Sequence, residues 1–507
     1  MPGPLRLVLV FCLVCAGCVR LGLREEPCEL GLDVEGGHAE PEASDPVATP
    51  KKKAWEATFG GEVAARPQVA ARVAGWPRTL VVDDLPADDA AFLRRLAADT
   101  WRGLAAFVDR EHALPVDHVA LGATLDRAAA RVGDYTNITN VGLYLAATAA
   151  AADLALVTRA EAIARIEAVL ATLKDLETYR GFFYNYYDTT SLERSSNFIS
   201  FVDTAWLVAG LMIVRQTFPE LHAPATRLIL RADFRFFYDP KRGRMAHGYW
   251  VQTNDRSRFH YGVLYAESRL GSLIAIGKDE APDTHWFSMV RTFSPACTWQ
   301  RETPIGRTEK EARGQRYYGG WYAWRDVRYV PSWGGSMFEA LMPTLVLDEA
   351  RWAPASLGAN DAAHVAVQRR YATEELGLPV WGMSPSATLE PGGYAEHGVP
   401  VLGTIVYPPG LVTPHASALA LAIEPAAATA NLRTLATRYH AYGDFGFYDA
   451  VDPASGAVAH AYLTLDQAMT FLAAANRVCG GCVQRRFAAD PIAGRAFPVL
   501  ADERFFD

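Results

Sequence analysis

The sequence predicts an all-α protein, and three observations support this. Apolar residues recur with the 3.6-residue period of a helix in several long segments. Half of the 507 residues are hydrophobic and about a fifth are charged, as in chains with a sizeable packed core. The composition does not break again after about residue 85. We therefore predict a signal peptide over residues 1–18, a tether and irregular lead-in over 19–84, and one large helical domain over 85–507.

Apolar stripes and helix starts mark the individual helices. One stripe runs from Phe92 to Val108, and another follows Thr158-Arg-Ala-Glu161. That tetrapeptide has the pattern of a capping box, in which the two polar side chains satisfy free backbone N–H groups. We expect Thr464-Leu-Asp-Gln467 to open a further helix. Between the helices lie stretches rich in aromatic residues, glycine and proline, at 181–188, 247–261, 317–335 and 442–449. Long loops in a compact domain are usually functional.

The composition argues against several classes of protein. A formal net charge of −8 gives no basic surface of the kind that binds nucleic acid. The 12 histidines are scattered, and the common motifs of metalloproteases, nucleotide-binding proteins and serine hydrolases do not occur, so we predict no metal and no organic cofactor. The 21 tyrosines and 12 tryptophans are more than a core requires. Side chains with an apolar body and a polar tip suit stacking on sugar rings.

The amino terminus indicates export. Residues 5–17 form an apolar run that is too short to span a membrane and is typical of a signal peptide. Ala16 and Gly17 before Cys18 resemble a bacterial lipobox, although Cys15 stands where an aliphatic residue is usual. We therefore predict lipidation of Cys18 and a periplasmic or outer-membrane lipoprotein that contacts the membrane only through this anchor. The alternative is simple secretion.

A cysteine pair near the carboxyl end has the spacing of a metal or redox motif. Cys479 and Cys482 are separated by two glycines. A zinc site needs a second ligand pair, and none stands near in the sequence. In an exported protein we expect a local disulfide instead.

The most informative position is a carboxylate set among apolar residues. If the segment around Glu267 is helical, the residues that share its face are Val263, Leu270 and Ile274. A buried carboxylate is costly unless it is paired or protonated, and burial raises its pKa toward the value that a general acid needs near neutral pH. The alternative is a structural ion pair between Glu267 and a buried arginine, Arg231 or Arg258.

Asp203 repeats this anomaly. In a helix it would share a face with Ile199, Trp206 and Leu207, all of which are core-type residues. The alternative is that its short side chain caps a helix beginning at Thr204.

Three more carboxylates stand beside aromatic residues. Glu339 follows a glycine-rich turn, and Asp188 and Asp449 each follow aromatic loop residues. Carboxylates next to aromatic rings suit the hydroxyls and faces of sugars, whereas the alternative for each aspartate is a turn-capping role.

Several motifs occur in one order along the chain: TNVGLY at 139–144, GFFYNYYD at 181–188, SFVD at 200–203, YAESRL at 265–270, SWGGSMFE at 332–339, VWGMS at 380–384, YGDFGFYD at 442–449 and QRRFAAD at 484–490. Together they resemble the bacterial glucoamylase-like domain family, which includes endo-β-1,2-glucanases and the cyclising domain of cyclic β-1,2-glucan synthases. The likeness covers most of the chain after about residue 90. Pro385 stands where synthase-type members commonly have glutamate, which favours the exported endo-β-1,2-glucanases of glycoside hydrolase family 144.

This resemblance implies an (α/α)6 barrel, a toroid of two rings of six antiparallel helices, with long functional loops at one end. It also implies action on β-1,2-linked glucan, with Glu267 as the general acid. For the opposing group two residues match: Asp449 as the base of an inverting enzyme, and Glu339 as the nucleophile of retaining members. The separation of the carboxyl groups distinguishes these outcomes.

We therefore predict an exported, endo-acting β-1,2-glucanase that inverts the anomeric centre and releases short sophoro-oligosaccharides. The expected sugar-binding residues are Asp188, Asp203, Trp206, Trp333 and Tyr448. One alternative is a retaining transglycosylase or a hydrolase of another glucan. A second is a non-catalytic, glycan-binding lipoprotein of the cell envelope. We predict no obligate protein partner.

Overall fold

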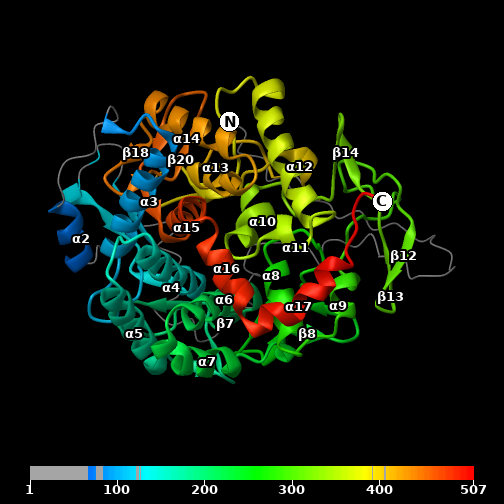
Figure 1. Ribbon diagram of the computed structural model, residues 1–507, viewed down its shortest axis with the longest axis horizontal. Helices are drawn as coiled ribbons and strands as arrows, with labels where there is room; N and C mark the ends of the chain where they lie inside the picture. Colours follow the sequence, from blue (N-terminus) through cyan, green and yellow to red (C-terminus); the bar gives the residue numbers. More distant parts are fainter. Residues whose placement is uncertain (1–66, 76–83, 122–124, 126, 391, 405–406) are drawn as a thin grey trace, which may run out of the picture.

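The computed structural model describes residues 67–75, 84–121, 125, 127–390, 392–404 and 407–507 (Figure 1). The predicted signal peptide, its Cys18 and most of the lead-in lie outside the described residues. None of the helices within these ranges has the length and apolar character that a membrane span requires.

The described chain is rich in helices, as the apolar periodicity predicts (Figure 1). Six of them are buried on nearly all sides and pack against one another at the centre. They are α4 (Ile138–Asp153), α6 (Phe201–Thr217), α8 (Arg269–Gly277), α10 (Met337–Leu341), α13 (Pro414–Leu419) and α15 (Thr464–Cys479). The start of α15 at Thr464 confirms the sequence prediction.

Two glycines allow α4 and α6 to pack with their backbones in contact. A Cβ atom on Gly210 would lie 2.1 Å from the carbonyl oxygen of Gly142, and one on Gly142 would lie 2.4 Å from the carbonyl oxygen of Trp206. Any larger residue at either position would therefore push the two helices apart.

A second set of helices covers the central ones, each with one buried face. Helix α3 (Asp89–Ala106) packs on α15, and α5 (Arg159–Asp175) packs on α4. The remaining pairs are α7 (His222–Arg231) on α6, α17 (Pro491–Ala501) on α8, α12 (Leu357–Arg370) on α10, and α14 (Pro425–Arg438) on α13. The capping box at Thr158 and Glu161 forms as predicted. Shorter helices are α9 (Thr284–Ser288), α11 (Glu349–Trp352) and α16 (Cys482–Ala489).

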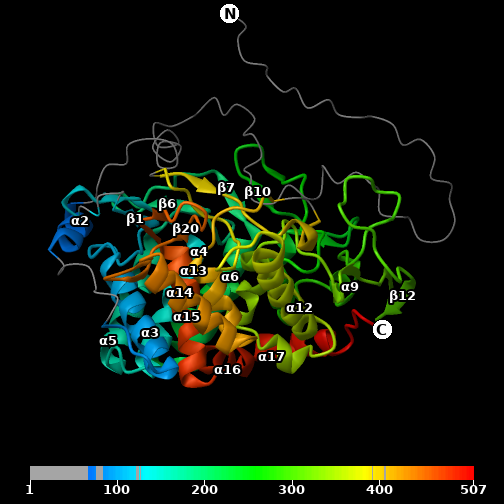
Figure 2. The ribbon, with the colours of Figure 1, turned by 90° about the horizontal axis from the view of Figure 1, so that it is seen from above.

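The aromatic stretches between the helices form short antiparallel strands. Figure 2 shows β1, β6, β7, β10 and β20 along one edge of the molecule, and α16 and α17 at the opposite edge. The sheets at the strand-bearing edge include β2 (Arg131–Val132), β1 (His118–Ala120) and β22 (Ala461–Leu463) in that order; β11 (Asp255–Arg256), β10 (Gly248–Trp250) and β7 (Phe198–Ser200); β3 (Tyr135–Asn137) with β6 (Tyr186–Asp188); and β20 (Ala450–Val451) with β21 (Val458–Ala459).

The other strand pairs are short hairpins. They are β4 (Thr178–Tyr179) with β5 (Phe182–Phe183), β8 (Tyr238–Asp239) with β9 (Arg244–Met245), β12 (Glu309–Ala312) with β13 (Gln315–Tyr318), β14 (Tyr322–Trp324) with β15 (Val327–Tyr329), β16 (Ser386–Ala387) with β17 (Tyr394–Ala395), and β18 (Tyr442–Gly443) with β19 (Gly446–Phe447).

Two features flank this helical body. Helix α2 (Pro67–Ala74) lies within the range predicted as irregular lead-in, and it buries Val69 and Val73 against the first part of the domain. Cys479 and Cys482 form the expected disulfide, which joins the end of α15 to the start of α16.

Candidate active site

Each of the six central helices carries a polar side chain at or just before its amino-terminal turn. These residues are Thr139 on α4, Asp203 on α6, Glu267 just before α8, Glu339 on α10, His415 on α13 and Asp466 on α15. The amino end of a helix has free N–H groups and a positive partial charge, so it tolerates a carboxylate better than any other part of a helix does. Four of these six residues are acids, and each lies where the helix start tolerates its charge.

Glu267 lies in a turn and not on a helix, which corrects the sequence prediction. Helix α8 begins at Arg269, and the residues before it form bends and a turn that follow the bridge between Val263 and Val290. Glu267 therefore does not present a helical face with its apolar neighbours. It is nevertheless largely enclosed: burial raises the pKa of its carboxyl to about 7, Arg269 opposes this shift, and the charge of Asp203 adds to it.

The predicted alternative, an ion pair with Arg231 or Arg258, does not occur. Arg231 Nε donates to the carbonyl of Gly181, and Arg258 lies over the ring of Phe259. No cation within the described ranges is within ion-pair distance of Glu267. Burial is therefore the largest influence on the pKa of its carboxyl, and burial favours the protonated form.

The charge of Glu267 acts directly on a second buried carboxyl, that of Glu339. The Glu339 carboxylate accepts hydrogen bonds from Ser332 Oγ at 2.9 Å and from the Gly334 N–H at 2.8 Å. Burial and the charge of Glu267 both raise the pKa of Glu339. The pKa of Glu339 is about 8 and that of Glu267 about 7, so both carboxyls exchange protons near neutral pH. The hydrogen bonds that Glu339 accepts favour its ionised form, and no donor from another described residue does the same for Glu267.

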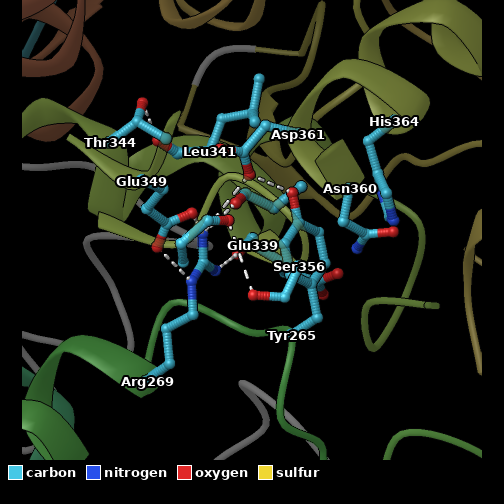
Figure 3. Close-up of polar contacts among 12 residues, drawn as sticks. Tyr265, Arg269, Glu339, Leu341, Thr344, Glu349, Ser356, Asn360, Asp361 and His364 are labelled. Atoms are coloured by element: carbon cyan, nitrogen blue, oxygen red, sulfur yellow. Dashed lines mark hydrogen bonds and ion pairs between the residues drawn. The ribbon is translucent and has the colours of Figure 1, made fainter. Parts of the chain in front are cut away.

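A buried arginine ties the turn that carries Glu267 to the helix that carries Glu339 (Figure 3). Arg269 Nε and Nη2 donate to the two carboxylate oxygens of Glu349, each at 2.8 Å. The same guanidinium donates to the carbonyls of Ala266 at 3.1 Å, Glu339 at 3.3 Å and Ala340 at 2.6 Å. Arg269 is fully buried, so these contacts fix the spacing between the two elements.

A second buried acid completes this network. Tyr265 OH donates to Asp361 Oδ1 at 2.6 Å, and Arg269 lies over the ring of Tyr265. Burial, together with the charge of Glu349, raises the pKa of Asp361 well above its ordinary value. Asp361 is therefore protonated, and Glu349 is the carboxylate that balances the charge of Arg269.

Asp203 is the third residue of α6, and Ser200 caps that helix by accepting the Asp203 N–H. The alternative in which Asp203 caps a helix starting at Thr204 is therefore wrong. Asp203 Oδ1 instead accepts a hydrogen bond from Thr139 Oγ1 at 2.6 Å, across the contact between α4 and α6. Burial raises the pKa of Asp203.

Asp449 lies apart from the Glu267–Glu339 pair, beside other helix starts. Its Oδ2 accepts the Ala387 N–H at 2.6 Å, while no backbone, hydroxyl or amide donor within the described chain reaches Oδ1. Burial raises the pKa of Asp449 to about 6. Its neighbours are Asp466 and His415, and one ligand atom from each of the three residues lies within 4.8 Å of the others. This is the group of side chains in the described structure that could hold a metal ion.

Tyrosines lie between the two groups of carboxyls. Burial and the charge of Asp203 raise the pKa of Tyr186. Burial and the charges of Asp466 and Asp449 raise the pKa of Tyr394. Tyr394 and Tyr186 also influence each other. A tyrosine therefore interacts with each group of acids, and side chains of this kind suit contacts with sugars.

Of the remaining predicted sugar-binding residues, Asp188 is half-buried and the three aromatic residues are buried. Asp188 Oδ1 accepts the N–H groups of Thr190 and Ser191, so the turn-capping role is present. Trp206, Trp333 and Tyr448 are buried. The indole N–H groups of both tryptophans have no hydrogen-bond partner in the described structure, which leaves them for a ligand or water. Sugar binding by these residues stays a prediction.

Sequence reasoning missed two kinds of residue. Asp466 and His415 lie at helix starts within ordinary-looking apolar stripes, and only their positions near a helix start could have drawn notice. Arg269 and Glu349 are 80 residues apart, and nothing local in the sequence indicates that they pair.

Comparisons with known proteins agree with this architecture. A family model described as "Putative glucoamylase" matches residues 308–491, and one described as a protein of unknown function (DUF3131) matches residues 126–272. The chain is 30% identical, over 332 residues, to the cyclic β-(1,2)-glucan synthase NdvB of Rhizobium meliloti. That match covers 60% of this chain but 10% of the synthase, so the chain spans about a tenth of the length of that relative.

Three solved structures share the fold. An endo-β-1,2-glucanase from Chitinophaga pinensis aligns with a TM-score of 0.61 at 15% identity, over 83% of this chain and 98% of its own. A β-1,2-glucanase from Parabacteroides distasonis gives 0.65 at 15%, over 82% and 61%. An endo-β-1,2-glucanase from Talaromyces funiculosus gives 0.63 at 12%, over 86% and 92%. The predicted resemblance to the glucoamylase-like family is confirmed, and the solved structures show that the fold is shared.

Proposed function

We propose that this protein is an endo-acting β-1,2-glucanase that hydrolyses its substrate with inversion. The linkage is supported by the relatives described above: the solved structures from the three organisms are β-1,2-glucanases, and the relative from Rhizobium meliloti is a cyclic β-(1,2)-glucan synthase. The observation that carries the chemistry is Glu267, a largely enclosed carboxyl that no cation neutralises and whose pKa is about 7. Such a group keeps a proton near neutral pH.

In the proposed reaction, Glu267 donates its proton to the glycosidic oxygen as the bond to the anomeric carbon breaks. Asp449 accepts a proton from a water molecule, directly or through a sugar hydroxyl, while the water oxygen bonds to the anomeric carbon from the opposite face. The leaving sugar departs as an alcohol, and short sophoro-oligosaccharides result. The lone pairs of Asp449 Oδ1 that no N–H or hydroxyl donor occupies support its role as the base.

A second candidate is a retaining reaction in which Glu339 is the nucleophile. The direct electrostatic interaction between Glu267 and Glu339 favours it, because retaining enzymes hold their two carboxyls about 5–5.5 Å apart. The hydrogen bonds from Ser332 and Gly334 to Glu339 argue the other way, since they engage the oxygens that would attack.

We also infer that the central helices form the inner ring of an (α/α)6 barrel. Packing contacts join α4, α6 and α8 in series, and join α10, α13, α15 and α4 in series. Arg269 links α8 to the carbonyls of α10, which supports a closed ring. The second set of helices would be the outer ring. For location, the predicted signal peptide and lipobox support a periplasmic or outer-membrane lipoprotein.

The test is incubation of the purified protein with linear β-1,2-glucan, with products followed by chromatography and the first-formed anomer by NMR. We expect short oligosaccharides whose new reducing ends have the α configuration. β anomers would shift the assignment to Glu339. Linear β-1,3- and α-1,4-glucans test the alternative substrates. Tight glucan binding without new reducing ends would favour the non-catalytic lipoprotein.

The matched variants are Glu267→Gln and Glu220→Gln. Glu220 forms a two-point ion pair with Arg159 on the surface after the carboxyl end of α6, opposite the site. We expect Glu267→Gln to lose at least about 10³-fold in kcat, within the range that loss of acid catalysis allows, and Glu220→Gln to keep wild-type activity. Near-full activity of Glu267→Gln would exclude it as the acid.

A further inference from the structure

We propose that the side chains of His415, Asp449 and Asp466 bind Zn²⁺, and that the bound cation inhibits hydrolysis by occupying Asp449. The inhibition rests on the proposed function, in which Asp449 is the base, whereas the binding site stands without it. Of the three residues, only Asp449 was among the predicted site residues. The three positions form no short motif, so a metal site is not predictable from the sequence.

Two helix starts and one loop bring the three side chains together. His415 is the second residue of α13, Asp466 is the third residue of α15, and Asp449 lies directly before β20. Helices α13 and α15 pack against each other. One ligand atom from each of the three side chains lies within 4.8 Å of the others. An imidazole nitrogen and two carboxylate oxygens are ligands that Zn²⁺ takes in proteins.

Each of these side chains has one buried polar atom for which the described structure shows no hydrogen-bond partner. The atoms are His415 Nδ1, Asp449 Oδ1 and Asp466 Oδ2, and the residues are only 2–3% exposed. Buried polar atoms in proteins are nearly always satisfied, so three such atoms in one group indicate a ligand. All three carry lone pairs that a cation accepts.

Hydrogen bonds on the far side of two ligands hold the free atoms in place. Thr413 Oγ1 lies 3.4 Å from His415 Nε2, and the Ala387 N–H donates to Asp449 Oδ2 at 2.6 Å. When Nε2 carries the ring proton and donates it to Thr413, His415 Nδ1 presents its lone pair to the two acids. Outer hydrogen bonds of this kind orient the ligands of protein metal sites.

One distance in the group already matches a zinc site. His415 Nδ1 and Asp466 Oδ2 are 3.4 Å apart. Two ligands at about 2.0–2.1 Å from a tetrahedral Zn²⁺ lie about 3.3 Å from each other. A proton placed between two of the three atoms leaves the third without a partner, whereas a cation binds all three and neutralises both carboxylates.

The ligand set also decides the kind of cation and its effect. Imidazole suits transition metals such as Zn²⁺, whereas Ca²⁺ and Mg²⁺ take six or more ligands that are mostly oxygen. Three protein ligands leave the fourth position of a tetrahedral Zn²⁺ for water. With its free oxygen bound to the cation, Asp449 cannot accept a proton from the attacking water, so the proposed reaction stops.

The first test is a calorimetric titration of the purified, chelator-treated protein with ZnCl₂. We expect one Zn²⁺ per chain to bind, and MgCl₂ at the same concentration to give no binding. His415→Gln removes the nitrogen ligand and keeps a polar side chain. Its Zn²⁺ affinity should fall at least about 100-fold, because loss of an outer hydrogen-bond partner alone costs about 10–100-fold. The matched control is His222→Ala, which removes an exposed histidine from the start of α7 and should bind Zn²⁺ as the wild type does.

These outcomes separate a built site from chance binding. A wild type that binds no stoichiometric Zn²⁺ overturns the proposal, and so does equal affinity in His415→Gln. Circular dichroism shows whether His415→Gln is folded; if it is not, Asp466→Asn removes another ligand, and the same loss of affinity is expected. X-ray absorption of the Zn²⁺-loaded wild type needs no variant. We expect nitrogen and oxygen ligands at about 2.0–2.1 Å with an imidazole contribution, and a shell without imidazole overturns the site.

The second test measures hydrolysis of linear β-1,2-glucan at a Zn²⁺ concentration that just saturates the wild type. We expect kcat of the wild type and of His222→Ala to fall at least about 10²-fold, the effect of losing a general base, and a chelator to restore it. In His415→Gln the ratio of rates without and with Zn²⁺ should be near one. A rate that bound Zn²⁺ leaves unchanged or raises overturns the inhibition. If the wild type cleaves no glucan but binds Zn²⁺ through His415, the proposed function fails while the binding site stands.

Discussion

At the scale of single residues, burial assigns different roles to carboxyl groups that look alike in the sequence. The pKa of Asp449 is raised to about 6 and that of Glu267 to about 7. The base must be ionised, so activity falls as the pH drops through the pKa of Asp449. The acid must be protonated, so activity falls as the pH rises through the pKa of Glu267. We therefore predict a narrow, bell-shaped pH profile of kcat/KM, with an acidic limb near the pKa of Asp449 and a basic limb near the pKa of Glu267.

The check is a kcat/KM profile between about pH 4 and 9 at constant ionic strength. Asp449→Asn should leave little activity at any pH, because the proton acceptor is gone. A flat profile across neutral pH would contradict the assignment of either group. A single basic limb would implicate Glu267 while removing Asp449.

Sequence analysis located Glu267 but for an incomplete reason. A carboxylate among apolar residues indicated burial, and burial is what the structure gives, yet the helical face is absent because α8 begins two residues later. The boundary depends on the bridge between Val263 and Val290, a contact that local periodicity does not encode. Asp466 escaped notice because a carboxylate near a helix start is ordinary on a solvent-facing helix.

At the scale of elements, the close packing of α4 and α6 depends on two backbones in contact. A Cβ atom on Gly210 would overlap the carbonyl oxygen of Gly142, which belongs to a helix and cannot move by itself. We predict that Gly210→Ala lowers the free energy of unfolding by about 2–3 kcal/mol or more. Gly494→Ala is the control: it lies in helix α17 with no atom within 4 Å of the added Cβ, so it should stabilise by about 0.5–1 kcal/mol. Urea unfolding of both variants checks this, and equal stabilities would contradict it.

The connection between α8 and α10 has a different physical basis, a buried ion pair. Glu349→Gln leaves the Arg269 guanidinium buried and only partly neutralised, which should cost about 3 kcal/mol or more. Because Arg269 also holds the backbone on both sides of the Glu267–Glu339 pair, kcat should fall more than KM changes. The control is Glu220→Gln, which removes a similar two-point pair from the surface and should change neither stability nor kcat appreciably. Unchanged kcat in Glu349→Gln would limit Arg269 to a role in stability.

The sequence predicts the positions of the helices far better than it predicts the structure of the segments between them. Apolar stripes located α3 and α5, and the capping box at Thr158 formed as its pattern indicates. The aromatic stretches were predicted as loops, whereas the structure places short strands in them, some with partners far along the chain, such as β6 with β3 and β10 with β7. Pairing of that kind is set by the assembled molecule and has no local signal.

At the scale of the whole molecule, the two ends of the helical body have separate roles. The central helices start where the acids gather, and the strands of the aromatic loops lie at that edge (Figure 2). The opposite end carries α16, α17 and the disulfide between Cys479 and Cys482. Asp466 and Cys479 are 13 residues apart on helix α15, so the disulfide lies about 20 Å from Asp466 along the helix axis.

This separation predicts that the disulfide supports stability and not catalysis. The bond closes a loop of four residues, for which the chain-entropy estimate is about 2 kcal/mol. We expect the double variant Cys479→Ala, Cys482→Ala to lose about 1–2 kcal/mol in urea unfolding while its kcat/KM and the position of both pH limbs match wild type. Wild-type protein treated with a reductant should behave in the same way. The contrary outcome is a loss of activity larger than the fraction of unfolded protein accounts for. It would show that a change at the disulfide affects the acids through α15, so that the two ends form one cooperative unit.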